Sequence, residues 1–144
     1  MGGDSNCFAP PVYYVTLEVE MLQGNTEDDG YGILFELCND ERYALFRVRE
    51  KMGKFSVVQT EDGGDNATVF IRQAPAPSIR KEAANKLAIL AIYDQHWFYI
   101  NDAFVGHHQI DRLPSARLDV GIVAGCQQQV ICGFRDFKVY TRNI

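Results

Sequence analysis

The run from Lys86 to Gln109 constrains the fold more than any other part of the chain. Residues 87–92 are apolar at every position, and residues 97–100 are aromatic or aliphatic, with polar turns at Asp94-Gln95 and Asn101-Asp102. Short apolar runs joined by tight polar turns are typical of antiparallel strands. Because a strand that is apolar on both faces must be covered on both, we expect this run to lie in the middle of a packed sheet.

Similar alternation recurs along most of the chain. In residues 12–22 aliphatic side chains alternate with threonine and glutamate, and further strands are predicted at 31–38, 43–50, 55–60, 67–73, 118–124 and 130–140. Two prolines in Ala74–Ser78 remove backbone donors, so this segment cannot belong to a central strand. The one helix-like stretch, Ile79–Asn85, predicts one or two turns at the crossover between sheets. Nine or ten short strands predict an all-β, two-sheet antiparallel β-sandwich with one short helix at most.

Composition fits one globular domain. The 144 residues are 47% hydrophobic and 12% aromatic, which is enough to build a core. We expect a flexible N-terminal segment, 1–11, and a single sandwich domain, 12–144. The net charge of −5 and the scattered arginines argue against nucleic acid as a partner. No apolar run approaches the ~20 residues that span a bilayer, and Met1–Asp4 lacks the pattern of a signal peptide.

The four cysteines allow two interpretations. Cys7, Cys38, Cys126 and Cys132 have no CxxC spacing, so a zinc site is not predicted. A bridge between the last two would close the short segment 127–131, whereas buried free thiols would pack as small hydrophobic groups. A disulfide would favour an exported protein. The tripeptide Asn66-Ala67-Thr68 matches the acceptor pattern for N-glycosylation.

Several motifs, taken in order, resemble a known group of sandwiches. The segments 31–35 (YGILF) and 39–46 (NDERYALF) resemble a strand pair of concanavalin A-like lectin/glucanase proteins. Within this group, the closer relatives would be the laminin-G-like and 3-keto-disaccharide-hydrolase-like branches, which include domains of unknown function. Residues 85–89 followed by 98–102 are similar to that group's "N.L.V … LYVNG" hairpin, with Asp102 where glycine is usual. Residues 118–122 resemble its "GxVGL", and 134–139 its closing "FDNFRV", with Arg135 and Asp136 replacing Asp-Asn.

This resemblance covers about residues 12 to 140, and it indicates the fold more strongly than the function. It implies two large stacked sheets, one flat or convex and one concave, and sugar-binding members use the concave face or the loops at its rim. It also implies a secreted or cell-surface location within a longer protein.

A set of polar residues on the early strands and the last strand is the candidate ligand-binding site. Its members are Glu18, Glu20, Glu36, Tyr43, Arg47, Arg49 and Asp136. If their strands are neighbours, carboxylates and arginine forks would bind hydroxyls while Tyr43 or Phe134 stacks on a ring. The alternative is a solvated face with cross-strand charge pairs worth a few tenths of a kcal/mol each.

Other chemistries have weaker support. Glu18 and Glu20 lie roughly 6.5–7 Å apart on one strand face, but the ExDxE strand of the glucanase branch is absent, so we expect no catalytic residues. We expect no metal or cofactor. Asp28, Asp29 and Asp40 are an alternative set of loop ligands for a Ca²⁺ ion, but they lack the DxDxDG spacing of a known calcium loop.

The histidines and large aromatic residues are expected to be structural. His107 and His108 face opposite sides of a strand and are predicted at the surface. His96, at a turn, is predicted to be hydrogen-bonded or exposed. Trp97 and Tyr99 share a face, where inter-sheet packing is favoured over a stacking platform.

The leading hypothesis is therefore a non-catalytic lectin-like module that binds carbohydrate or another exported ligand. One alternative is a structural or protein-interaction module of the laminin-G-like type, which would use the loops 27–31 and 106–114. The second is a sugar-processing hydrolase acting through Glu18, Glu20 or Glu36.

Overall fold

The computed structural model describes residues 11–23, 29–39, 41–62, 67–112, 117–123 and 130–142. They form ten antiparallel strands and, within these ranges, no helix. The strands are β1 Val12–Gln23, β2 Gly30–Leu37, β3 Tyr43–Arg49, β4 Lys54–Thr60, β5 Ala67–Pro75, β6 Asn85–Ile92, β7 Gln95–Ile100, β8 Ala103–Gln109, β9 Arg117–Val123 and β10 Ile131–Thr141. The predicted all-β sandwich is confirmed, but the predicted helical turn at 79–85 is wrong, because residues 81–82 form a turn and Asn85 begins β6.

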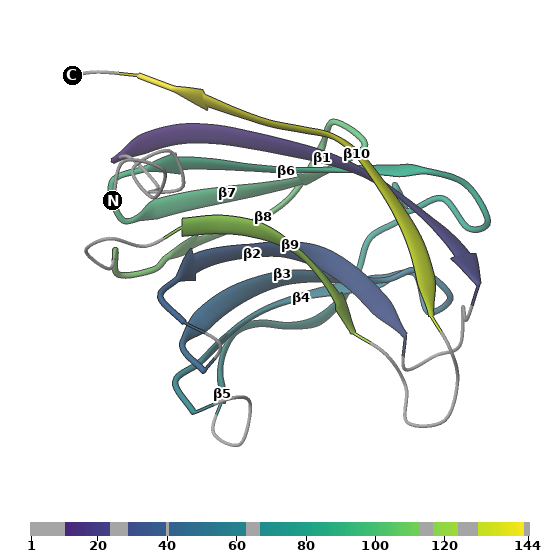
Figure 1. The fold of residues 1–144 in the computed structure, drawn as a ribbon, viewed down its shortest axis with the longest axis horizontal. Helices are drawn as coiled ribbons and strands as arrows, with labels where there is room; N and C mark the ends of the chain where they lie inside the picture. Colours follow the sequence, from purple (N-terminus) through teal and green to yellow (C-terminus); the bar gives the residue numbers. More distant parts are fainter. Residues whose placement is uncertain are drawn as a thin grey trace.

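The strands build two five-stranded sheets (Figure 1). One has the order β10-β1-β6-β7-β8 and the other β5-β4-β3-β2-β9. In Figure 1 the strands of both layers arch in the same direction, so the outer face of the first sheet is convex and that of the second is concave. We call them the convex sheet and the concave sheet. The chain passes from one to the other between β5 and β6, as the sequence predicted for this crossover.

The central position of β6 explains why its residues 87–92 are apolar on both faces. It pairs with β1 on one side and β7 on the other, which makes it the middle strand of the convex sheet. Leu87, Ile89 and Ala91 point inward and are fully buried. On the outer face, Ala88 is buried between the side chains of neighbouring strands, Leu90 is half-buried and Ile92 is exposed.

Alternate residues of both sheets fill the space between the layers. Strands β1, β2 and β3 supply Val15, Leu17, Val19, Tyr31, Ile33, Phe35, Ala44, Phe46 and Val48, all without solvent exposure. Aromatic rings join the layers at the centre: Phe98 of β7 lies 5.0 Å from Phe46 of β3 and 5.9 Å from Phe35 of β2, centroid to centroid. Burial of this apolar surface is the main stabilising term of the fold.

A buried hydrogen-bond network holds the crossover between the sheets. The Tyr31 hydroxyl donates to the Glu50 carboxylate at 2.8 Å, and the Asn85 amide donates to Tyr31 at 2.9 Å. Asn101 donates to the Asn85 side-chain oxygen at 2.8 Å and to the Ser78 carbonyl at 2.7 Å. The two asparagines of the "N.L.V … LYVNG"-like hairpin therefore tie strands of both sheets to the crossover segment.

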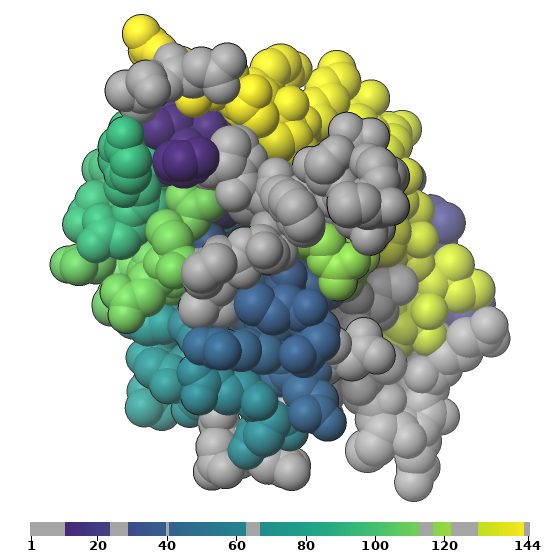
Figure 2. All heavy atoms as spheres, turned by 60° about the vertical axis from the view of Figure 1, so that its left-hand side comes forward, coloured from purple at the N-terminus to yellow at the C-terminus, as the bar shows by residue number. Residues whose placement is uncertain are grey.

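Figure 2 turns toward the viewer the end of the sandwich at which β1 begins and β2 ends. The purple start of β1, blue residues of β2 and β3, and teal-green residues from the β6–β7 region meet around this end. The expected flexible segment 1–11 lies outside the described residues except for Pro11, and so does Asn66 of the glycosylation tripeptide. Among the described residues, no helix is long and apolar enough to cross a membrane.

Candidate functional site

The seven predicted ligand-binding residues do not share one surface. Glu18 and Glu20 lie on β1 and Asp136 on β10, all on the convex sheet. Tyr43, Arg47 and Arg49 lie on β3, in the concave sheet, and point away from the core. The remaining residue, Glu36 of β2, is inside the protein. The strands that were assumed to be neighbours belong to different layers, so a single charged surface is not formed.

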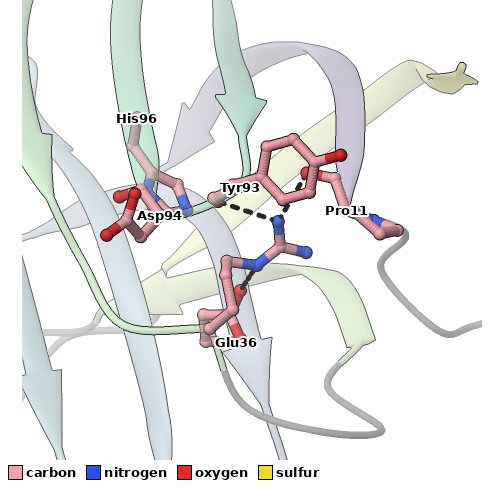
Figure 3. Close-up of polar contacts among 6 residues, drawn as sticks. Pro11, Glu36, Tyr93, Asp94 and His96 are labelled. Carbon is pink, nitrogen blue, oxygen red and sulfur yellow. Dashed lines mark hydrogen bonds and ion pairs between the residues drawn. The ribbon is translucent and has the colours of Figure 1, made fainter. Parts of the chain in front are cut away.

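Glu36 is a buried structural residue in this fold, which corrects its expected place on the solvent face. Its backbone φ of 50° lies in a bulge of β2, and its side chain accepts a hydrogen bond from Arg112 Nε at 2.5 Å. The same guanidinium donates to the carbonyls of Pro11 at 2.9 Å and Tyr93 at 3.0 Å (Figure 3), and it lies 5.2 Å from the Tyr13 ring centroid. The arginine thus connects both sheets at this end.

His96 lies beside this cluster and is fully buried, so of the two predicted alternatives the hydrogen-bonded one holds and the exposed one does not. Its Nδ1 is 3.1 Å from the Asp94 carbonyl, its ring centroid is 5.4 Å from that of Phe35, and Nε2 has no hydrogen-bond partner in the described part of the chain. Burial lowers the pKa of His96 to about 4. The imidazole is therefore neutral at physiological pH.

A groove of about 530 Å³ crosses the convex face along β1 and β10. Its lining residues are Tyr14, Thr16, Leu17, Glu18, Lys86, Asp136, Lys138 and Tyr140. The groove lies at a bulge in the β1–β10 ladder, where Asp136 has a φ of 55°. Two tyrosines lie at one side of the groove, with the Tyr14 and Tyr140 ring centroids 6.1 Å apart.

Several charges in this groove are already paired within the protein. Glu18 accepts two hydrogen bonds from the guanidinium of Arg135, one of them from Nε at 2.9 Å, and Lys86 donates to Asp102 at 2.8 Å. These are cross-strand ion pairs on a solvated face, the arrangement that was the alternative to a ligand groove. Such exposed pairs contribute little to stability, because water screens the attraction between the charges.

The concave face has a different arrangement, because two arginines lie at alternate positions toward the end of its middle strand. Arg47 and Arg49 occupy alternate positions of β3, the middle strand of this sheet, so their Cα atoms are roughly 6.5–7 Å apart. Both side chains are half-buried. Lys54 of β4 is the cross-strand partner of Arg49, and Ser56 is the partner of Arg47.

Glycines on β2 and β9 form a flat floor beside these arginines. Gly32 pairs with Arg47 on one side and with Gly121 on the other. A Cβ on Gly32 would lie 1.8 Å from the Phe46 carbonyl oxygen, and one on Gly30 would lie 3.3 Å from the Arg47 Cγ. The stem of Arg47 therefore lies over Gly30, and the Leu34 side chain lies over Gly121, 3.3 Å from the place of a Cβ.

The cations of the concave face have no acidic partner among the described residues. None of the ion pairs there involves Arg47, Arg49 or Lys54. The Nε atoms of both arginines and the Ser56 hydroxyl are also buried without a hydrogen-bond partner in the described ranges. Burial and, secondarily, the neighbouring Arg49 charge lower the pKa of Arg47 below its usual range. We therefore take this face, with its Tyr43, as the candidate site.

Two aromatic residues expected between the sheets lie on the convex face instead. Trp97 and Tyr99 alternate with the buried Phe98 and Ile100, so they point outward and are half-buried. The Trp97 ring centroid lies 4.8 Å from that of His107. As predicted, His107 and His108 face opposite sides of β8: His107 is exposed, and His108, half-buried, contacts Phe70 of β5.

Cys38 and Cys132 are free thiols, and Cys126, the other residue of the bridge that the sequence allowed, lies outside the described residues. Burial raises the pKa of Cys132 to about 11. Within the described ranges, no group of histidine, cysteine and acidic residues is arranged to hold a metal ion. The proposed calcium ligands Asp28 and Asp40 lie outside those ranges, and Asp29 is buried.

Comparison with known proteins identifies the fold. No family model and no curated protein matches the sequence. Among solved structures, the carbohydrate-binding module CBM66 from Bacillus subtilis superimposes with a TM-score of 0.70 at 17% identity, over 90% of this chain and 75% of that one. The fold is a jelly-roll β-sandwich.

Two further solved structures support this conclusion. Sheep galectin-11 in complex with glycerol matches with a TM-score of 0.58 at 13% identity, over 87% of this chain and 92% of that one. The GH43 protein BlXynB from Bacillus licheniformis matches with a TM-score of 0.63 at 12% identity, over 87% of this chain but only 26% of its own. These neighbours are consistent with a concanavalin A-like sandwich; the laminin-G-like and 3-keto-disaccharide-hydrolase-like branches stay a prediction.

Sequence reasoning found the arginines but missed what surrounds them. Lys54, Ser56 and the glycine floor were not singled out, although Gly30 and Gly32 alternate with the apolar Tyr31 and Ile33. Glycine at alternate outward positions of a strand is a signal of close approach by another group. That signal would have indicated the floor beside Arg47.

Proposed function

We propose that this chain is a non-catalytic lectin-like module that binds carbohydrate on the concave face of its sandwich. One observation carries this proposal. The Nε atoms of Arg47 and Arg49 and the Ser56 hydroxyl have no hydrogen-bond partner, and the arginines have no ion-pair partner, among the described residues. Buried polar groups normally have hydrogen-bond partners, and a group without one costs about 1–3 kcal/mol. A ligand rich in hydroxyl or anionic oxygens would supply the missing acceptors.

The surroundings of these arginines suit a saccharide. Tyr43 lies on the same face of β3 as the two arginines, at alternate positions of the strand. Aromatic and planar guanidinium groups, with a few directed polar contacts, are the usual means of orienting small ligands. Structural similarity to a carbohydrate-binding module and a galectin supports the proposal at the level of fold.

Binding is favoured over hydrolysis by the state of the candidate carboxylates. Glycoside hydrolysis needs two acids flanking the cleaved bond. Glu18 is engaged by Arg135, and Glu36 is buried against Arg112, so neither is positioned for that role. The proposed function is therefore recognition of a sugar chain without its cleavage.

A secreted or cell-surface location within a longer protein goes with this proposal. The two described cysteines are free thiols and add no support from disulfide bonding.

The test is a glycan array that includes neutral and acidic oligosaccharides, followed by calorimetric titration of the glycans that bind. We expect saturable binding that Arg47→Ala weakens and Lys138→Ala, on the convex face, does not. If no glycan binds at millimolar concentration while the protein remains folded, the proposed function is wrong. If Lys138→Ala weakens binding and Arg47→Ala does not, the ligand lies in the convex groove and the concave site is wrong.

A further inference from the structure

The charge of the concave face differs in sign from that of the chain. The sequence carries a net charge of −5, yet three cations, Arg47, Arg49 and Lys54, lie next to each other on two adjacent strands. Among the described residues on this face, the acid brought nearest by strand register is Asp119 of β9, which is separated from Arg47 by the whole width of β2.

Like charges at neighbouring positions of one strand face repel one another. In a protein with more acids than bases, two half-buried arginines without an ion-pair partner among the described residues are therefore an unfavourable arrangement. By contrast, Glu18, Arg135, Lys86 and Asp102 on the convex face neutralise each other in pairs. The difference indicates that the concave face is built for a negatively charged occupant.

The geometry of the cations narrows the class of ligand. A guanidinium presents parallel N–H donors that match the two oxygens of a carboxylate or sulfate, and two such groups on alternate strand positions would contact charges on a chain that runs along β3.

We propose that the concave face binds an anionic saccharide, one that carries carboxylate or sulfate groups, through the paired guanidinium groups of Arg47 and Arg49. This inference rests on the proposed function and adds the charge class of the sugar. Lys54 adds a third positive charge beside Arg49, and Tyr43 contacts the uncharged part of the chain. The ligand lies along β3, with its acidic groups toward the Arg49 end.

The test compares acidic oligosaccharides with neutral forms of the same chains. The probes are oligogalacturonate and its methyl ester, together with a heparin tetrasaccharide and its desulfated form. Calorimetric titration with the whole chain should show that at least one acidic probe binds about tenfold or more tightly than its neutral form. Affinity should fall as sodium chloride is raised, because the contact is between opposite charges near the surface.

Matched variants locate the contact. Arg47→Gln/Arg49→Gln and Lys138→Gln/Arg142→Gln each remove two positive charges, the first pair from the concave face and the second from β10 of the convex sheet and the residue that follows it. We expect the first double variant to abolish the preference for the acidic probe and the second to keep it. Should the first variant fail to fold by circular dichroism, Arg47→Lys/Arg49→Lys keeps the charge but loses the fork, and the preference should fall severalfold.

Each other outcome overturns a specific statement. Equal affinity for acidic and neutral probes would overturn this inference and leave carbohydrate binding intact. Equal weakening by both double variants would show attraction by overall charge, which also overturns it. If no saccharide of either kind binds, the proposed function is wrong, and the inference is wrong with it.

Discussion

Burial of His96 should make this protein sensitive to mild acid. The unfolded chain has an ordinary histidine pKa near 6.5, and the folded protein holds the pKa of His96 at about 4. Because the folded-state value is the lower one, the unfolded chain binds the proton more tightly and acid favours unfolding. The stabilising effect of the neutral ring is complete above pH 6.5 and is lost as the pH falls toward 4.

The size of the effect follows from that difference in pKa. At about 1.4 kcal/mol per pKa unit, the two values correspond to about 3 kcal/mol over the whole window, of which about 2 kcal/mol is lost by pH 5. That is a large part of the 5–15 kcal/mol by which typical domains are stable. Most carboxylates are still ionised at pH 5, so the histidine term is best measured between pH 7.5 and 5.

The assay is urea unfolding followed by far-ultraviolet circular dichroism at several pH values across this window. His96→Gln keeps an amide that can donate to the Asp94 carbonyl but cannot take up a proton, so its stability should fall by about 2 kcal/mol less than that of the wild type. His107→Gln, which changes an exposed histidine, should retain the wild-type pH dependence. If the wild type and His96→Gln lose stability in parallel between pH 7.5 and 5, the reasoning from burial is refuted.

Three further predictions concern stability and reactivity. Arg112→Met should lower the free energy of unfolding by about 3 kcal/mol in urea titrations, because it removes the guanidinium from the buried Glu36 carboxylate; a change below about 1 kcal/mol would contradict the role of this ion pair. Gly32→Ala should cost about 1–3 kcal/mol because its methyl group meets the backbone, whereas Gly133→Ala, whose Cβ would have no heavy atom within 3.7 Å, should be tolerated; equal thermal shifts would be inconsistent with this. The Cys132 thiol, with a pKa raised to about 11, should react with iodoacetamide at pH 8 much more slowly in the native protein than in urea, and mass spectrometry of the peptide would reveal rapid native labelling if the reasoning is wrong.

The layer architecture could be predicted from the sequence because two-residue alternation reports directly on which side chains face a core. Residues 12–22 and 87–92 show this clearly, and the prolines at 75 and 77 indicated the edge of a sheet: β5 is an edge strand and Pro75 is its last residue. Alternation fails wherever a strand contains a bulge. Glu36 follows a register shift in β2, so its side chain points inward although the period places it outside.

Alternation also leaves open which strands share a sheet. The polar positions of β1 and β3 look alike along the sequence, yet they lie on opposite outer faces of the sandwich. Pairing partners far apart in the chain depend on packing of the whole structure, which one sequence does not reveal. The sequence could therefore predict which residue types form the candidate site. It could not predict that the arginines lie on one face of the sandwich and the acids on the other.

The pairing of β1 with β10 has a consequence for how the chain assembles. Strands β2 to β5 and β6 to β8 pair mainly with their immediate successors, so each set can form soon after it is synthesised. The edge strand β10 of the convex sheet, however, pairs with β1, which brings residues near 141 beside residues near 13. Such distant contacts slow folding, because a long loop must close before they are made. A ribosome-bound nascent chain would leave one edge of β1 without its hydrogen-bonded neighbour until β10 emerged, and this interval is when aggregation or chaperone binding would compete with folding.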